Sequence, residues 1–243
     1  MRFYFLNIDS LDKLTITKTV KKDFEFDIQI VEVDHSFNIE MNKWLALRSS
    51  IEKAMIEEDD LVLFSIGSLA ISEFFTLKSL LSQLSNSLKK GVDLLIGNVI
   101  EFGQAVPLSS TLFWIDHFFG SSMMVFFKPA FKKIMNVTFK KNDSFDIKIF
   151  ESLNRKILIY PFISNITPTI VNSTSPEKQV ELSQCTVAKL EMYKSSYSHF
   201  ILLKEEIQSL KDRKKEYEDV YSRYIVLREQ FISNLSRSSF FKS

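Results

Sequence analysis

Apolar runs of strand length alternate with segments of helical periodicity over the first 165 residues, and this alternation constrains the fold more than any other feature. Between residues 41 and 57, for example, Trp44, Leu47 and Ile51 recur at intervals of three and four and so share one helix face. Strands are expected at 3–8, 26–34, 61–66, 92–100, 122–127 and 156–163, and helices at 41–57, 72–89, 129–135 and 143–154. Strands that alternate with helices predict an α/β domain with a mainly parallel, mixed sheet sandwiched by helices.

The composition changes at residues 164–178, which are rich in Ser, Thr, Asn and Pro and show little periodicity. Such a stretch is typical of a connection between two folded parts. We therefore predict a linker at 166–178, which separates an α/β domain at 1–165 from a C-terminal helical segment at 179–243.

Large side chains in the C-terminal segment step by three and four from Phe200 to Phe231, interrupted by Lys214 and Arg228. This heptad pattern predicts one long, coiled-coil-like helix or a helical hairpin. The apolar seam would either pair with a second copy of the chain or fold back to cover the α/β domain, since both arrangements use the same spacing. We favour self-association, so a homo-oligomer formed through this helix is expected.

Charge and cysteine content exclude several classes of protein. The net charge is +1, so no global field favours nucleic acid as a partner. The single cysteine, Cys185, excludes an internal disulfide and a zinc cluster, which is typical of a cytoplasmic protein. No apolar run reaches the roughly 18 residues of a membrane span. The aromatic and basic end at 236–243 would still allow peripheral contact with the inner face of a membrane.

Four segments follow one another along the chain: NKWLALRSSIEKAMIEEDD, LVLF, GVDLLIGNVIEFGQAVPLSSTLFWIDHFFGSSMMVFFKPAFKKI and ILIYPFIS. Their order resembles that of glycosyltransferases of the type A fold, above all bacterial transferases of lipopolysaccharide and other surface polysaccharides. The resemblance covers residues 1–165 and omits the helical tail. It implies an enzyme that transfers a sugar from a nucleotide sugar to a glycan or lipid-linked acceptor in surface-polysaccharide synthesis.

The metal-binding motif of that family is degenerate in this sequence. The family's central strand ends in acids that hold a divalent metal on the donor diphosphate. Here the strand ends in Ser65, Ile66, Gly67 and Ser68. The acids Asp59 and Asp60 precede the strand and would lie about 20 Å from its carboxyl end. We therefore assign no metal ligand, and Mn²⁺ or Mg²⁺ would bind only if another acid replaces the motif.

Five residues are candidates to bind the nucleotide sugar at the carboxyl edge of the sheet, as the resemblance implies. Asn7 stands at the tip of the first strand, Asp34 ends the second, and Ser65 and Ser68 lie at the tip of the central strand. Arg48, on the preceding helix, would pair with the diphosphate in bidentate fashion. From the residues alone, Asp34 equally fits a turn-forming aspartate, and Arg48 equally fits a surface ion pair.

The segment FWIDHFFG, residues 113–120, carries the candidate acceptor site. Asp116 is predicted as the catalytic base that orients or deprotonates the acceptor hydroxyl. Trp114 and His117 are predicted to contact the acceptor, Trp114 by stacking on a sugar ring. Core packing is the alternative for Trp114, and a packed or surface position is the alternative for His117. Asp146, on the last predicted helix, is a second candidate acid.

The missing acids also favour a different class of function. A non-catalytic relative would keep the glycosyltransferase fold, bind or scaffold other molecules, and associate through its C-terminal helix. Titration with nucleotide sugars, with and without manganese, separates the two hypotheses.

Overall fold

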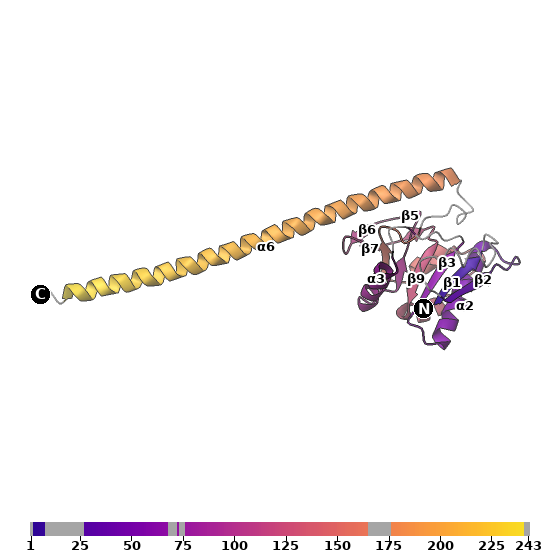
Figure 1. Ribbon diagram of the computed structural model, residues 1–243, viewed down its shortest axis with the longest axis horizontal. Helices are drawn as coiled ribbons and strands as arrows, with labels where there is room; N and C mark the ends of the chain where they lie inside the picture. The colour runs from indigo at the N-terminus through magenta and orange to yellow at the C-terminus, as the bar shows by residue number, and fades with distance from the viewer. Residues whose placement is uncertain (1, 8–26, 68–71, 73–75, 165–175, 241–243) are drawn as a thin grey trace. The chain divides into compact units, whose positions relative to one another are not determined.

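The computed structural model describes residues 2–7, 27–67, 72, 76–164 and 176–240 (Figure 1). The chain divides into two compact units, Met1–Lys194 and Ser195–Ser243. The first unit holds a sheet and its covering helices, together with the first turns of the long helix α6 (Pro176–Phe240). Within the described residues, the second unit is the rest of that helix, residues 195–240.

One mixed sheet organises the first unit, and its strands lie beside one another in Figure 1. In the described residues it has eight strands in the order β2 (Asp27–Glu32), β1 (Arg2–Asn7), β3 (Leu61–Ile66), β9 (Met123–Phe127), β4 (Leu94–Ile96), β10 (Lys156–Ile159), β7 (Leu112–Ile115) and β6 (Ala105–Pro107). Strands β9 and β7 run opposite to the others. The mainly parallel, mixed sheet that the sequence predicts is therefore confirmed.

Helices cover both faces of this sheet, because successive side chains of a strand point to opposite sides. Tyr4, Phe64 and Phe126 face a core shared with α2 (Ile39–Ile56), α4 (Lys128–Met135) and α5 (Phe145–Ser152). Phe3 and Phe5, on the other face, share a core with Leu80 and Leu84 of α3 (Leu77–Lys89). Strands buried on both faces explain the continuous apolar runs in the sequence.

Most of the predicted elements are confirmed in the described residues, and the exceptions have local causes. The strand expected at 92–100 is shorter, because the chain turns after Ile96 and the N–H of Gly97 donates to the carbonyl of Met123 at 2.8 Å. Strand β10 ends at Ile159, two residues before Pro161, which has no N–H to donate. The sheet strands β6 and β7 and the small ribbon of β5 (Glu101–Phe102) and β8 (Phe118–Phe119) were not predicted, since strands of two to four residues show no clear period.

The first turns of α6 pack on the α/β unit. Leu190 is fully buried, the hydroxyl of Thr186 donates to the carbonyl of Ile100 at 2.7 Å, and the hydroxyl of Tyr160 donates to Glu191 at 2.7 Å. Most of the predicted linker lies outside the described residues, so the predicted domain boundaries stay a prediction. No helix in the described parts of the chain is both long enough and apolar enough to cross a membrane.

Candidate functional site

The sheet has a topological switch point at strands β1 and β3. The chain passes from β1 to β2 on one side, and after α2 it returns to form β3 on the other side of β1. In open α/β sheets ligands bind outside the carboxyl ends of the strands at such a point, where the connections leave a crevice. The carboxyl edge around Asn7, Glu32 and Gly67 is therefore the candidate site, and we call it the switch-point edge.

Asn7 and Glu32 form a side-chain pair at this edge. The two residues are register partners at the ends of β1 and β2. The amide nitrogen of Asn7 donates to the two carboxylate oxygens of Glu32 at 3.3 and 3.1 Å. Asn7 is buried, whereas Glu32 is exposed, so the carboxylate is held in place yet keeps acceptor capacity toward solvent. Sequence reasoning missed Glu32, because the pairing of two distant strands determines its neighbour.

The tip of β3 supplies backbone rather than side-chain groups to the edge. The hydroxyl of Ser65 is fully buried and donates to the carbonyl of Ser122 at 3.0 Å, so it does not face the switch-point edge. Gly67 has φ +70°, a conformation that favours glycine, and its N–H donates to the carbonyl of Leu6 at 3.0 Å. The chain thus turns away beside β1 with no side chain at Gly67. Ser68, the other predicted phosphate ligand, lies outside the described residues.

A buried polar cluster braces the neighbouring part of the same edge. The carbonyl oxygen of the Asn98 side chain accepts the N–H groups of Ser122 and Met123 at 2.8 and 3.3 Å. Its amide nitrogen donates to the hydroxyls of Ser122 and Ser164, the latter at 2.8 Å. Asn98, Ser122 and Ser164 are all fully buried. These bonds tie the segments after β4 and β10 to the start of β9 and satisfy polar groups that water cannot reach.

A second buried cluster joins the first turns of α2 and α5. Glu40 accepts from Lys43 at 2.7 Å with one oxygen and from the backbone N–H of Phe145 at 2.7 Å with the other. Asp146 accepts from the N–H of Gly120 at 2.8 Å. Burial raises the pKa of Asp146 to about 6, although the Gly120 N–H and the charge of Lys43 oppose this shift. Asp146 is therefore a buried acid that titrates close to neutral pH.

Asp116 lies away from the switch-point edge, because β7 runs antiparallel to β10. Trp114 pairs with Ile157, so the residues after β7 stand at the amino end of β10. Burial raises the pKa of Asp116, but bonds from the N–H groups of Gln104 and His117, at 2.8 and 2.6 Å, more than offset it, and the pKa lies below its ordinary value. A depressed pKa makes a weaker base.

The other predicted acceptor residues flank Asp116. Trp114 is half-buried and packs against the core on the α3 face of the sheet. The side chain of His117 is exposed, with Nδ1 3.1 Å from the Asp116 carboxylate. The catalytic role of Asp116 and the acceptor roles of Trp114 and His117 stay predictions, and the structure does not bring these residues to Asn7.

The two remaining donor candidates are Asp34, which follows Glu32 by two residues, and Arg48. The carboxylate of Asp34 accepts the N–H and the hydroxyl of Ser36 at 2.9 and 2.7 Å, and these bonds lower its pKa. This is the turn-forming arrangement that the sequence left open. Arg48 lies in the middle of α2, about 14 Å along the helix axis from Ile39. Their donor-binding roles stay predictions.

The described residues of the switch-point edge do not fit a divalent cation. Mg²⁺ or Mn²⁺ needs several oxygen ligands, whereas among the described acids here Glu32 is bonded to Asn7 and Asp34, two residues later, accepts from its own turn at Ser36. Within the described ranges no three His, Cys, Asp or Glu side chains gather as metal ligands do. Asp59 and Asp60 lie at the opposite, amino-terminal edge, where they pair with Arg2 and Lys128.

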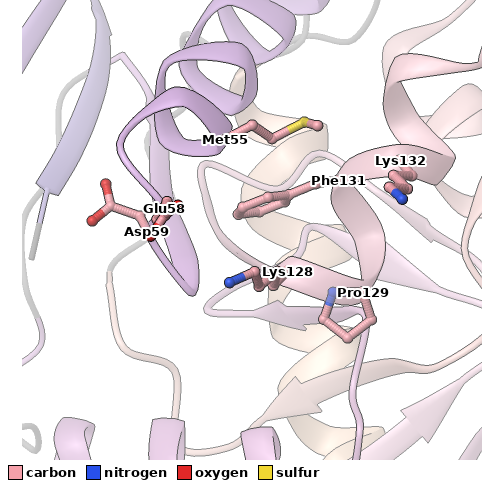
Figure 2. A pocket seen from close by; sticks show the side chains of 7 residues that line it. All are labelled: Met55, Glu58, Asp59, Lys128, Pro129, Phe131 and Lys132. Atoms are coloured by element: carbon pink, nitrogen blue, oxygen red, sulfur yellow. The ribbon is translucent and has the colours of Figure 1, made fainter.

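A pocket of about 470 Å³ lies at that amino-terminal edge, between the end of α2 and the start of α4 (Figure 2). Figure 2 shows the ring of Phe131 between the side chains of Met55 and Lys128, which line the pocket with it. Lys128 pairs with Asp60 at 3.3 Å, so its charge is already partly neutralised. Because the pocket faces the amino ends of the parallel strands, it is separate from the switch-point edge.

Comparisons with known proteins find a weak similarity to solved structures and no similarity at the level of sequence families. No protein-family model and no curated protein matches the sequence. A solved structure of A197 from STIV is 14% identical, has a TM-score of 0.44, and is matched over 65% of this chain and 81% of its own. An apo UDP-glucose pyrophosphorylase is 12% identical with a TM-score of 0.39, over 75% and 72% of the two chains. A UDP-glucose pyrophosphorylase complexed with UDP-glucose is 13% identical and has a TM-score of 0.39. The match covers 68% of this chain and 67% of that chain.

Proposed function

We propose that this protein is a glycosyltransferase-like protein that binds a nucleotide sugar at the switch-point edge and transfers its sugar to a glycan or lipid-linked acceptor. The observation that carries the proposal is the Asn7–Glu32 pair beside the Gly67 turn. A carboxylate at the end of a strand next to a switch point accepts hydrogen bonds from ribose hydroxyls, as it does in other open α/β sheets. Glu32 supplies that carboxylate, and Asn7 keeps it oriented.

Gly67, at the tip of β3, lies beside the end of β1, the strand that carries Asn7. Without a side chain at Gly67, a diphosphate can approach the main chain closely. The buried hydroxyl of Ser65 donates to the carbonyl of Ser122 and so holds the end of β3 against the start of β9. We assign Ser65 this role instead of contact with the phosphates. Donor binding therefore rests on Glu32 and Asn7, with space for the diphosphate beside Gly67.

Sugar transfer makes a bond between the acceptor oxygen and the anomeric carbon and breaks the bond from that carbon to the diphosphate. The acceptor proton must pass to a base. Asp116 remains the base that the sequence predicts, and this role requires the attacking hydroxyl and the anomeric carbon to meet within hydrogen-bond reach of its carboxylate, at the amino end of β10 and away from the switch-point edge. Binding of the donor does not depend on that assignment.

One observation favours the second candidate function, a non-catalytic binding protein. Within the described residues no three acidic or other metal-ligating side chains gather, and the hydroxyl of Ser65 is already bonded to Ser122. A site of this kind binds a nucleotide sugar but lacks the cation that neutralises a departing diphosphate. This alternative keeps the donor site and omits the transfer.

The test is calorimetric titration of the full chain with UDP, GDP, UDP-glucose and GDP-mannose, with and without Mn²⁺. Glu32→Gln is expected to weaken the tightest ligand about tenfold or more, because a neutral amide accepts a hydroxyl hydrogen bond less well than a carboxylate. The matched control Glu52→Gln makes the same change at an exposed position near the end of α2, toward the amino-terminal edge, and it should change affinity less than about twofold.

Equal losses from both variants, or no binding of any probe, would reject the switch-point edge as the donor site. Turnover of the bound nucleotide sugar, followed as release of the nucleoside diphosphate, then separates the transferase from the non-catalytic protein.

A further inference from the structure

The second unit exposes a row of large apolar side chains that Lys214 and Arg228 interrupt. In heptad notation the a positions include Phe200, Ile207 and Tyr221, and the d positions include Leu203, Leu210, Tyr217 and Tyr224. Their exposed fractions run from 52% at Ile207 and Leu210 to 75% at Tyr217. Apolar rows of this extent on a soluble helix mark a surface that another molecule covers. The spacing is that of a coiled-coil seam.

The charges beside the seam identify the second molecule. Glu206 and Arg213 occupy g positions, and Lys211 and Glu218 occupy the e positions that follow them. In a parallel, in-register pair, each g residue faces the e residue five positions later on the other helix. Glu206 then meets Lys211 of the second copy, and Arg213 meets Glu218. Both contacts join opposite charges, and two-fold symmetry repeats each of them.

Farther along the helix, the residues at the e and g positions beside the seam are apolar, and a parallel pair brings them together. Val220 and Leu227 stand at g positions and Ile225 at an e position, so the seam widens toward the C-terminus. Val220 and Leu227 are more than half exposed. In a parallel pair this wide part lies against its own copy, where Val220 meets Ile225. Apolar surface is then buried against apolar surface.

An antiparallel pair fits these residues less well. If Lys214 stands opposite Tyr217, the wide apolar flank at 220–227 faces the stretch 204–211, whose e and g positions carry Lys204, Glu206 and Lys211. In this antiparallel register the two charge pairs of the parallel arrangement are lost, and one contact between opposite charges, Lys211 with Glu218, forms instead. The parallel arrangement keeps the charges paired and the apolar flanks together.

We infer that the helix beyond Lys194 binds a second copy of this chain as a parallel, in-register, two-stranded coiled coil. The basic a positions favour this state, because Lys214 and Arg228 place their charged ends at the edge of a two-stranded seam but would be buried in larger bundles. Lys214 also lies 3.7 Å from Glu218 of its own helix, which offsets part of its charge. The inference is independent of the proposed function.

Charge reversal tests the register. Sedimentation equilibrium of the full chain should give a dimer, and Glu206→Lys should weaken it about tenfold, since two attractive pairs become repulsive. The double variant Glu206→Lys, Lys211→Glu should restore most of the loss, because residues five apart do not face each other within one helix. Glu205→Lys is the matched control: position 205 lies outside the seam and should leave the dimer unchanged.

Disulfide trapping tests the orientation in a Cys185→Ser background. A Leu210→Cys chain should cross-link to itself on oxidation, because d positions of a parallel pair lie within the Cα separation of a disulfide. A chain that remains a monomer at about 100 µM, a concentration at which seams of four heptads associate, would overturn the inference. A Leu210→Cys chain that cross-links only to a Tyr221→Cys chain would show an antiparallel pair and would also overturn it. Assembly that requires anionic phospholipid vesicles would overturn it as well.

Discussion

Asn7 and Glu32, which are 25 residues apart in sequence, are joined by hydrogen bonds of 3.3 and 3.1 Å across the carboxyl ends of β1 and β2. The pair joins a buried amide to an exposed carboxylate. An exposed Glu side chain is ordinarily free to change rotamer, and losing that freedom costs entropy when it binds a ligand. Asn7 removes part of that cost in advance, so the pair is a preorganised acceptor at the switch point.

The first prediction follows from this preorganisation. Asn7→Ala should weaken nucleotide-sugar binding about fivefold, because Glu32 keeps its charge but loses its orienting donor. Titration calorimetry measures the change, with Asn38→Ala, at the exposed N-cap of α2, as the control for loss of an asparagine. Affinity that is the same in Asn7→Ala as in the unmodified chain would show that Glu32 needs no orientation.

The second prediction concerns the buried cluster around Asn98. Asn98→Ala should lower the free energy of unfolding by about 3 kcal/mol, because it leaves buried N–H and hydroxyl groups without acceptors or donors. Asn86→Ala, on the exposed side of α3, is the control and should change stability by less than about 0.5 kcal/mol. Urea unfolding with unchanged m-values measures both. Equal midpoints for the two variants would contradict the bracing role of Asn98.

The third prediction is a pH dependence that arises from Asp146. Its pKa is about 6 in the folded chain, above the unfolded value, so between about pH 4 and pH 6 the folded state binds the extra proton. Stability therefore falls as the pH rises through this window and levels off above it. The free energy of unfolding of the unmodified chain relative to Asp146→Asn should drop by about 2–3 kcal/mol from pH 4 to pH 7.

Urea unfolding at several pH values measures this difference, and subtraction of the variant removes the contribution of other carboxylates. Glu40 and Lys43 lie nearby, but the only side chain that differs between the two proteins is that of residue 146. A difference that stays constant, or that grows with pH, would show that Asp146 titrates near its ordinary pKa.

The fourth prediction concerns the first turns of α6. Leu190→Ala should cost about 3 kcal/mol of stability, because it removes a fully buried side chain from the core. Leu202→Ala is the same change twelve residues later in the same helix, at a side chain that is 62% exposed, and should cost less than about 1 kcal/mol. Thermal or urea unfolding compares them. Similar losses for both would mean that the helix before Lys194 is not part of the α/β unit.

The sequence by itself determined the class of fold. The helix from Ile39 to Ile56 and the strand from Leu61 to Ile66 are confirmed within a few residues of their predicted ends. Both signals are local: a helix repeats every 3.6 residues, and a strand buried on two faces is a continuous apolar run. The long C-terminal helix follows from the same kind of pattern, since neither glycine nor proline interrupts it after Pro176.

Only the tertiary structure decided which side chains share an edge of the sheet. Glu32 lies beside Asn7 because two strands pair in one register, and a shift by one residue would turn it to the other face. Asp116 stands at the amino end of β10 because β7 runs antiparallel, which a short apolar run does not reveal. Ser65 is unavailable because its hydroxyl bonds Ser122, 57 residues away. Pairing between distant segments depends on the whole packed chain, whereas helix and strand periods are present in each segment alone.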